Sequence, residues 1–233
     1  MSARFEELDV RPTPMGELVL RRRRMPSSDT DIYEVKLGDD FLMSSMFTVA
    51  EREMARLALR ELPGTELDVL VGGLGLGYTA RTVLDDARVG RLTVVEALGE
   101  VIDWHRRGLV PAATSESSDA RCTLHHGDLF AMLRADDPFG GRRFDAFVVD
   151  IDHSPRHVLA PGHADFYTPA GTARLAAHLR PGGVFALWSN DPPDEAYSAV
   201  LAGVFATAAA EVVRFPNPLQ GREATNTVYV ATV

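Results

Sequence analysis

Short apolar runs alternate with longer amphipathic segments along most of this chain. Runs rich in β-branched and other apolar residues predict strands near residues 67–71, 91–95, 121–125, 144–149 and 183–188. The segments with helical spacing lie near residues 77–88, 98–108, 128–134, 169–179 and 193–208. Strands that alternate with helices are typical of a parallel sheet covered by helices on both faces. We therefore expect an α/β fold of the doubly wound, Rossmann-like type.

The first 47 residues show a different pattern. Glu17–Arg22, Ile32–Leu37 and Phe41–Ser45 alternate or carry β-branched and aromatic residues, and a Gly-Asp-Asp turn separates the last two runs. This pattern predicts a small antiparallel β unit. We interpret Arg21–Arg24 as a solvated strand edge, where charged side chains discourage pairing with other strands.

The rest of the chain forms a second unit with an antiparallel end. Thr48 and Glu51 have the spacing of a capping box, which predicts a helix that runs to about Leu62. Glu211–Phe215 and Thr227–Val233 are strand-like, and no helix is expected between them, so they should pair antiparallel. We therefore expect a small β unit over residues 1–47 and a nucleotide-binding domain over residues 48–233.

A glycine-rich loop follows the first strand of the alternating region. Gly72, Gly73, Gly75 and Gly77 lead from a buried strand into a helical segment. A strand that turns into a helix in this way directs backbone N–H groups and the positive end of the helix dipole toward one point. Glycines also let a ligand approach the main chain closely. This loop is expected to bind a nucleotide.

Acidic residues recur where the predicted parallel strands end. Glu96 ends the second strand, nineteen positions after Gly77, and Asp128 follows the third strand next to Gly127. Asp150 follows the fourth strand. Because a doubly wound sheet binds its ligand at the carboxyl ends of its strands, these side chains should meet at one site. Glu96 would reach the ribose hydroxyls of a bound nucleoside.

Composition narrows the range of partners. The chain has 233 residues and a net charge of −9, which favours a cationic substrate and disfavours nucleic acid or an anionic membrane. No apolar run is long enough to span a bilayer, so no membrane partner is expected. A single cysteine, Cys122, fits a reducing cytoplasm. We leave a homodimer open as the assembly.

The motifs resemble those of the spermidine synthase family, the polyamine aminopropyltransferases, within the class I S-adenosylmethionine-dependent methyltransferase fold. Val95–Asp103 is similar to the family's V-E-I-D-x-x-V-I-D stretch, and Phe144–Asp150 to its Y-D-V-I-I-V-D strand. Thr79–Arg81 resembles the helix after the glycine loop. Asp165–Tyr167 and Arg180–Val184 are similar to its F-Y and L-K-P-G-G-V segments.

The resemblance covers roughly residues 30–190 and implies roles for the residues that match. It implies a mostly parallel seven-stranded sheet that ends in an antiparallel hairpin, with a small β unit before it. Gly73, Gly75 and Gly77 would hold the methionine-derived tail of S-adenosylmethionine or its decarboxylated form, which acts as co-substrate. Glu96 would hold the ribose, and Asp128 would receive the adenine amino group. The implied activity is aminopropyl transfer to an amine.

Three positions depart from the family pattern. The family's glycine loop carries an acid that binds the aminopropyl amine, and Gly75 stands at that place. The loop Asp150–Pro155 has one more residue before its proline, and His153 stands where a second acid is expected. The family's Gln and Tyr signature near the β unit is not evident in Leu42–Glu53. The sequence thus leaves the acceptor open, as well as the choice between aminopropyl and methyl transfer.

An amine acceptor must lose a proton before it attacks a sulfonium carbon, so a carboxylate or imidazole beside it is useful as a base. Asp150, Asp152 and His153 are the candidate catalytic residues. The same loop with His157 or His163 could instead hold a divalent metal, but its mixed, irregular spacing is weak evidence, and we expect no metal.

Two further classes of function remain as alternatives. Gly75, Gly77 and Ala80 also satisfy the dinucleotide pattern, which would suit a nicotinamide-dependent reductase, although no Tyr-Lys pair accompanies it. The altered acids would suit a nucleoside-binding homologue without catalysis. The sequence favours a class I transferase, with an S-adenosylmethionine-dependent methyltransferase as the second choice.

Overall fold

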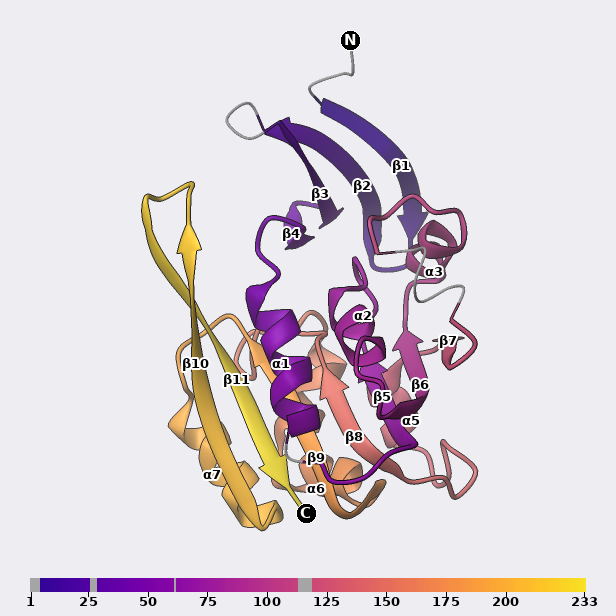
Figure 1. Cartoon of the computed structure of the whole chain (residues 1–233), viewed down its shortest axis with the longest axis vertical. Helices are drawn as coiled ribbons and strands as arrows, with labels where there is room; N and C mark the ends of the chain where they lie inside the picture. The colour runs from indigo at the N-terminus through magenta and orange to yellow at the C-terminus, as the bar shows by residue number, and fades with distance from the viewer. Residues whose placement is uncertain (1–4, 26–28, 61, 113–118) are drawn as a thin grey trace.

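The computed structural model describes residues 5–25, 29–60, 62–112 and 119–233. These residues form a four-stranded sheet of order β1-β2-β3-β4 and a seven-stranded sheet of order β10-β11-β9-β8-β5-β6-β7. The small sheet lies beyond the carboxyl ends of the parallel strands of the large one (Figure 1).

The small sheet is antiparallel throughout. Its strands are β1 (Phe5–Thr13), β2 (Gly16–Met25), β3 (Thr30–Leu37) and β4 (Asp40–Ser44). The interpretation of Arg21–Arg24 as a strand edge is wrong, because β2 pairs with β1 on one side and β3 on the other. Arg21 Nε and Arg23 Nε donate to the buried carboxylate of Glu34 at 2.7 and 2.8 Å. These arginines therefore stabilise the interior of the small sheet.

The large sheet confirms the predicted fold. Its parallel strands are β5 (Leu67–Gly72), β6 (Val89–Glu96), β7 (Cys122–His126), β8 (Phe144–Val149) and β9 (Leu179–Ser189). The final hairpin joins β10 (Thr207–Asn217) to β11 (Arg222–Thr232), and β11 pairs antiparallel with β9. Pro181, Gly182 and Gly183 form an irregularity inside β9, where the pairing steps from Phe144–Leu179 to Ala146–Val184.

Helices cover both faces of the large sheet. One face carries α1 (Val49–Arg60), α2 (Tyr78–Leu84) and α3 (Gly99–Arg106). The other carries α5 (Leu129–Leu133), the 3₁₀ helix η1 (Pro161–Tyr167), α6 (Pro169–Ala176) and α7 (Glu195–Val204). None of the helices in the described residues is long and apolar enough to cross a membrane.

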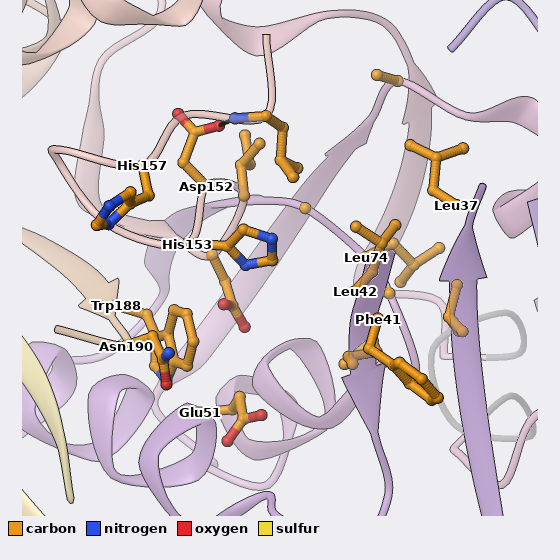
Figure 2. A pocket seen from close by; sticks show the side chains of 18 of the residues that line it. Leu37, Phe41, Leu42, Glu51, Leu74, Asp152, His153, His157, Trp188 and Asn190 are labelled. Atoms are coloured by element: carbon orange, nitrogen blue, oxygen red, sulfur yellow. Dashed lines mark hydrogen bonds between the residues drawn. The ribbon is translucent and has the colours of Figure 1, made fainter. Parts of the chain in front are cut away.

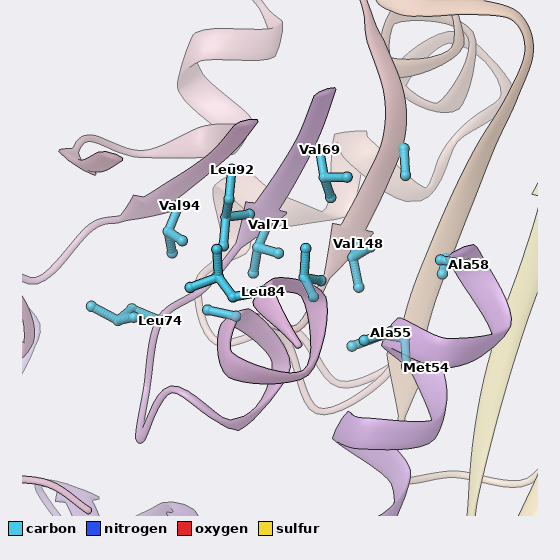
Figure 3. Packing of buried hydrophobic residues seen from close by; sticks show 14 of the residues in the cluster. Met54, Ala55, Ala58, Val69, Val71, Leu74, Leu84, Leu92, Val94 and Val148 are labelled. Carbon is cyan, nitrogen blue, oxygen red and sulfur yellow. The ribbon is translucent and has the colours of Figure 1, made fainter. Parts of the chain in front are cut away.

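Each strand divides its side chains between the two faces. On β5, Val69 and Val71 join the hydrophobic cluster under α1 and α2, while Leu70 joins the cluster on the opposite face. Figure 3 shows Val69, Val71 and Val148 of the sheet beside Met54 of α1. Burying one such side chain stabilises the fold by about 1.5–3 kcal/mol. This two-residue period is why the strands could be located from sequence.

The small sheet packs on the large unit through apolar and polar contacts. Leu18, Leu20 and Val35 of the small sheet belong to the same buried cluster as the glycine-loop residue Leu74. Trp104 Nε1 on α3 donates to Asp9 Oδ2 on β1 at 2.9 Å. These contacts hold the small sheet over the glycine loop.

Candidate active site

A cavity of about 940 Å³ lies where the two sheets meet. The lining comes from the small sheet, α1, the glycine loop, the ends of β6, β7 and β8, and the β10–β11 hairpin. Figure 2 shows part of it, including Phe41 of the small sheet, Glu51 of α1 and Leu74 of the glycine loop. Most of the predicted site residues line it: Gly73, Gly75, Glu96, Gly127, Asp128, Asp150, Asp152 and His153. Acids that end different strands therefore meet at one place, as the sheet topology requires.

Gly72 and Gly77 are not among the residues that line this cavity. Gly72 ends β5, where an added Cβ would overlap Leu129. Gly77 precedes α2 with a φ of 88°, a left-handed conformation that favours glycine. Their part in binding the co-substrate stays a prediction, while Gly72 leaves room for Leu129 and Gly77 permits the turn into α2.

The two remaining loop glycines approach their neighbours closely. Gly73 has a φ of 90°, and an added Cβ would overlap the carbonyl oxygen of Asp150. Gly75 has a φ of 47°, and its added Cβ would overlap Met43 Sδ from β4. The glycine loop is thus placed against the end of β8 on one side and the small sheet on the other.

The loop N–H groups are mostly occupied by the protein itself. Leu74 N–H donates to Glu96 Oε2 and Leu76 N–H to Met43 Sδ, both at 2.8 Å, and Gly73 N–H donates to Val95 O at 2.9 Å. The expectation of free N–H groups is wrong for these three. Their partners come from distant parts of the chain, so the loop motif alone did not reveal them.

Glu96 is the acid that joins the glycine loop to β6. Its side chain accepts from Leu74 N–H at Oε2 and from Leu98 N–H at Oε1, each at 2.8 Å. Only 9% of Glu96 is exposed. Because each carboxylate oxygen has two lone pairs, each can still accept a hydrogen bond from a ligand hydroxyl. Glu96 can therefore hold the loop and a ribose at the same time.

Asp128 has a structural use as well as a place in the cavity. Its Oδ1 accepts from Phe130 N–H and Ala131 N–H at 2.9 and 3.0 Å, which caps α5. The preceding Gly127 donates its N–H to Glu96 O at 2.9 Å. The second carboxylate oxygen of Asp128 accepts no hydrogen bond from the described residues, so it is free to meet a ligand amino group.

Asp150 stands at the centre of the carboxyl ends. Its N–H donates to Gly72 O at 2.8 Å, which extends the pairing of β8 with β5, and Thr79 Oγ1 donates to Asp150 Oδ2 at 3.1 Å. Burial raises the pKa of Asp150 to about 6, although the hydrogen bond from Thr79 acts in the opposite direction. A carboxylate with such a pKa can accept a proton near neutral pH.

Asp152 accepts hydrogen bonds from three other residues. It is 2% exposed and accepts from Leu159 N–H at 2.8 Å, His163 Nδ1 at 2.7 Å and the Tyr167 hydroxyl at 2.8 Å. These three donors tie the carboxylate to the segment from Leu159 to Tyr167. Its geometry favours holding the loop after β8 in place.

The two histidines of this loop differ in their surroundings. The ring of His153 lines the cavity, and its backbone carbonyl accepts from Asn190 N–H at 2.7 Å (Figure 2). His157 Nδ1 lies 2.7 Å from Asp191 Oδ2 and 3.2 Å from Ser154 Oγ. Asp191 and Ser154 both contact the same ring nitrogen of His157. A Ser-His-Asp catalytic triad needs the serine at one ring nitrogen and the aspartate at the other, so these three residues are not arranged as such a triad. The described residues contain no group of His, Cys, Asp and Glu arranged to hold a metal ion.

Sequence reasoning missed several side chains that line the cavity. The sequence pattern predicts only a capping role for Glu51 of α1, yet the residue is 8% exposed and lines the cavity. Burial, together with the nearby charge of Asp150, raises the pKa of Glu51 to about 8. Trp188 and Asn190, at the end of β9, lie on the same wall (Figure 2). Glu51, Trp188 and Asn190 could not be predicted from the acids at the strand ends, because none of the three is such an acid.

Comparison with known proteins points to one family. The family model for the spermine/spermidine synthase domain matches residues 48–214. Polyamine aminopropyltransferase 2 of Pseudomonas aeruginosa is 32% identical over 148 residues, which are 59% of this chain and 39% of that protein. A polyamine aminopropyltransferase of Pyrobaculum aerophilum is 27% identical over 181 residues, 76% of this chain and 60% of that protein. The chain thus spans between about two fifths and three fifths of the length of these two relatives.

Solved structures share the fold. A spermidine synthase in complex with the transition state analogue AdoDATO superposes with a TM-score of 0.73 at 17% identity, over 97% of this chain and 72% of that one. Spermidine synthase from Thermotoga maritima gives a TM-score of 0.72 at 18% identity with the same coverage. These likenesses cover the small sheet as well as the large one.

Proposed function

The chain belongs to the spermine/spermidine synthase family, and we propose that it transfers an aminopropyl group from decarboxylated S-adenosylmethionine to an amine. The observation that carries the proposal is the meeting of Glu96, Asp128 and Asp150 with the glycine loop in one cavity. Relatives that match this chain are named polyamine aminopropyltransferases.

The donor would lie along the glycine loop and the ends of β6 and β7. Glu96 would accept from the ribose hydroxyls while it keeps its bonds to the loop. The free oxygen of Asp128 would accept from the adenine amino group. The end of the donor tail would meet Gly75 and the sulfur of Met43, without a carboxylate at that position of the loop. We therefore propose that the donor is held mainly through its nucleoside.

The acceptor would lie beside Asp150. In the reaction the amine nitrogen forms a bond to the carbon next to the sulfonium, and the carbon–sulfur bond breaks with its electron pair going to sulfur. The thioether that leaves is neutral, so positioning matters more than help for the leaving group. The ammonium must first give up a proton, at a cost of about 4–5 kcal/mol at pH 7 for an amine of pKa near 10.4. Asp150 would accept it, with the ring of His153 next to it in the cavity wall and Asp152 holding the loop.

We also propose the wider setting of this activity. The partner would be a small cationic amine, to which a chain of net charge −9 is attractive, with no nucleic acid or membrane involved. The single Cys122 fits a cytoplasmic location. The small sheet over residues 1–47 and the domain over residues 48–233 would act as two units that close the cavity between them.

Calorimetric titration tests the proposal on the donor side. Purified protein is titrated with decarboxylated S-adenosylmethionine, S-adenosylmethionine and methylthioadenosine. Preference for the decarboxylated donor or methylthioadenosine supports aminopropyl transfer. Preference for S-adenosylmethionine would replace it with methyl transfer, and binding of none of them would favour a homologue without catalysis.

A further inference from the structure

Glu51 is a buried acid in the wall of the cavity. It lies in the first turn of α1, a helix that packs against α2 and β9. Its exposed fraction is 8%, and it lines the cavity together with Trp188 and His153 (Figure 2). No strand-end motif accounts for an acid here.

The carboxylate of Glu51 lacks a donor from any other described residue. Its own backbone N–H is the donor that favours its charged form. The neighbouring Arg52 is directed elsewhere: its guanidinium lies 4.9 Å from the centre of the Tyr78 ring, and its Nε donates to Thr48 Oγ1 at 3.3 Å. A buried carboxylate without donors is unfavourable unless it is protonated or meets a cation.

A second carboxylate of the cavity lining acts on Glu51. The charge of Asp150 opposes ionisation of Glu51, so Glu51 holds its proton more tightly than burial alone would make it. The other groups that act on Glu51 are Arg52 of its own helix and Tyr78 of α2. Asp191, which follows β9, is bound by Ser154 and His157. A cation placed between Glu51 and Asp150 would satisfy both.

We propose that Glu51 is a second carboxylate of the acceptor site, which together with Asp150 binds the ammonium group of a primary amine. The inference rests on the proposed aminopropyl transfer for the identity of the reaction. On binding, the ammonium displaces the proton that Glu51 holds, and this proton goes to solvent. The bound ammonium then gives one of its own protons to the pair, and its nitrogen lone pair forms the new bond to carbon. Glu51 thus binds the acceptor and shares in its deprotonation.

Amine binding tests this without any need for turnover. The protein, saturated with methylthioadenosine, is titrated calorimetrically at pH 7 with putrescine, agmatine and propylamine in buffers of different ionisation enthalpy. Wild type should bind at least one amine and release protons as it does so. Glu51→Gln should bind that amine about 10- to 100-fold more weakly, with little or no proton release and unchanged affinity for methylthioadenosine.

Glu53→Gln is the matched control, because Glu53 lies on the same helix and is paired 3.6 Å from Arg56. Glu53→Gln should behave as wild type, and the unchanged methylthioadenosine affinity of Glu51→Gln shows that this variant has folded.

Equal amine affinity and equal proton release in wild type and Glu51→Gln would overturn the role of Glu51 while aminopropyl transfer stands. Amine binding that depends on Glu51 without turnover of the decarboxylated donor would support the role of Glu51 and overturn the transfer. Failure of wild type to bind any of the three amines would overturn both.

Discussion

Replacing Glu96 with glutamine tests how the nucleoside half of the site is built. The two side-chain oxygens of Glu96 each accept one backbone N–H at 2.8 Å, from Leu74 and from Leu98. Glutamine has nearly the same shape but only one acceptor oxygen. In Glu96→Gln, the amide NH₂ must therefore face one of these two N–H groups, which loses its acceptor.

The size of the effect follows from these contacts. Losing a hydrogen bond to a charged acceptor costs about 1.5–3 kcal/mol, and a buried donor left unpaired costs about 1–3 kcal/mol. Because the two costs overlap, we expect the free energy of unfolding to fall by about 2–4 kcal/mol. Loss of the charged acceptor for a ribose hydroxyl should weaken nucleoside binding by about 1.5–3 kcal/mol, or roughly 10- to 100-fold.

Urea unfolding measures the loss of stability, and calorimetric titration with methylthioadenosine measures the loss of nucleoside affinity. Asp128→Asn is the matched control for loss of a negative charge, because one oxygen, Oδ1, accepts both capping N–H groups and asparagine caps as well as aspartate. Its free energy of unfolding should stay within about 0.5 kcal/mol of wild type. Wild-type stability in Glu96→Gln would refute its role in holding the loop, and wild-type affinity would refute its role at the ribose.

Four further substitutions probe the proposed acceptor site and the glycine loop. Asp150→Asn should lower turnover at least 100-fold with unchanged methylthioadenosine affinity, and steady-state rates near wild type would remove Asp150 from the mechanism. Gly73→Ala should destabilise the protein more than Gly75→Ala, since its Cβ meets the fixed carbonyl of Asp150 rather than the flexible end of Met43; urea midpoints in the reverse order would contradict this packing. Burial raises the pKa of Glu51 from 4.5 to about 8, so the folded state holds this proton more tightly than the unfolded chain. Wild-type stability should therefore decline relative to Glu51→Gln as pH rises from about 4.5 to 8, and parallel stability curves would argue against a proton on Glu51.

The large sheet was predictable because its strands carry a local signal. Val69, Leu70 and Val71 alternate between two apolar clusters, and such runs recur between segments of helical spacing. Strand β1 was missed because most of its residues are exposed and their chief partner is β2. The burial of Glu34 between two arginines of β2 also depends on pairing between strands, which no local pattern reveals.

The meeting of three strand-end acids in one cavity was predictable for a similar reason. Glu96, Asp128 and Asp150 each follow a parallel strand, so their meeting follows from topology alone. Met43 and Glu51 reach the cavity from a different sheet and from a helix that crosses the large sheet, so their place depends on how these units pack. The predicted use of Asp152 as a base did not foresee its three donors, which come from seven to fifteen residues further along the chain.

Product formation tests the central claim most directly. The protein is incubated with decarboxylated S-adenosylmethionine and a mixture of primary amines, and methylthioadenosine and the amine products are followed by mass spectrometry. Aminopropyl transfer predicts methylthioadenosine in equal amount to an amine that has gained one aminopropyl group, and neither product with Asp150→Asn. Formation of neither by the wild-type protein, under conditions where it binds the donor, would contradict the account.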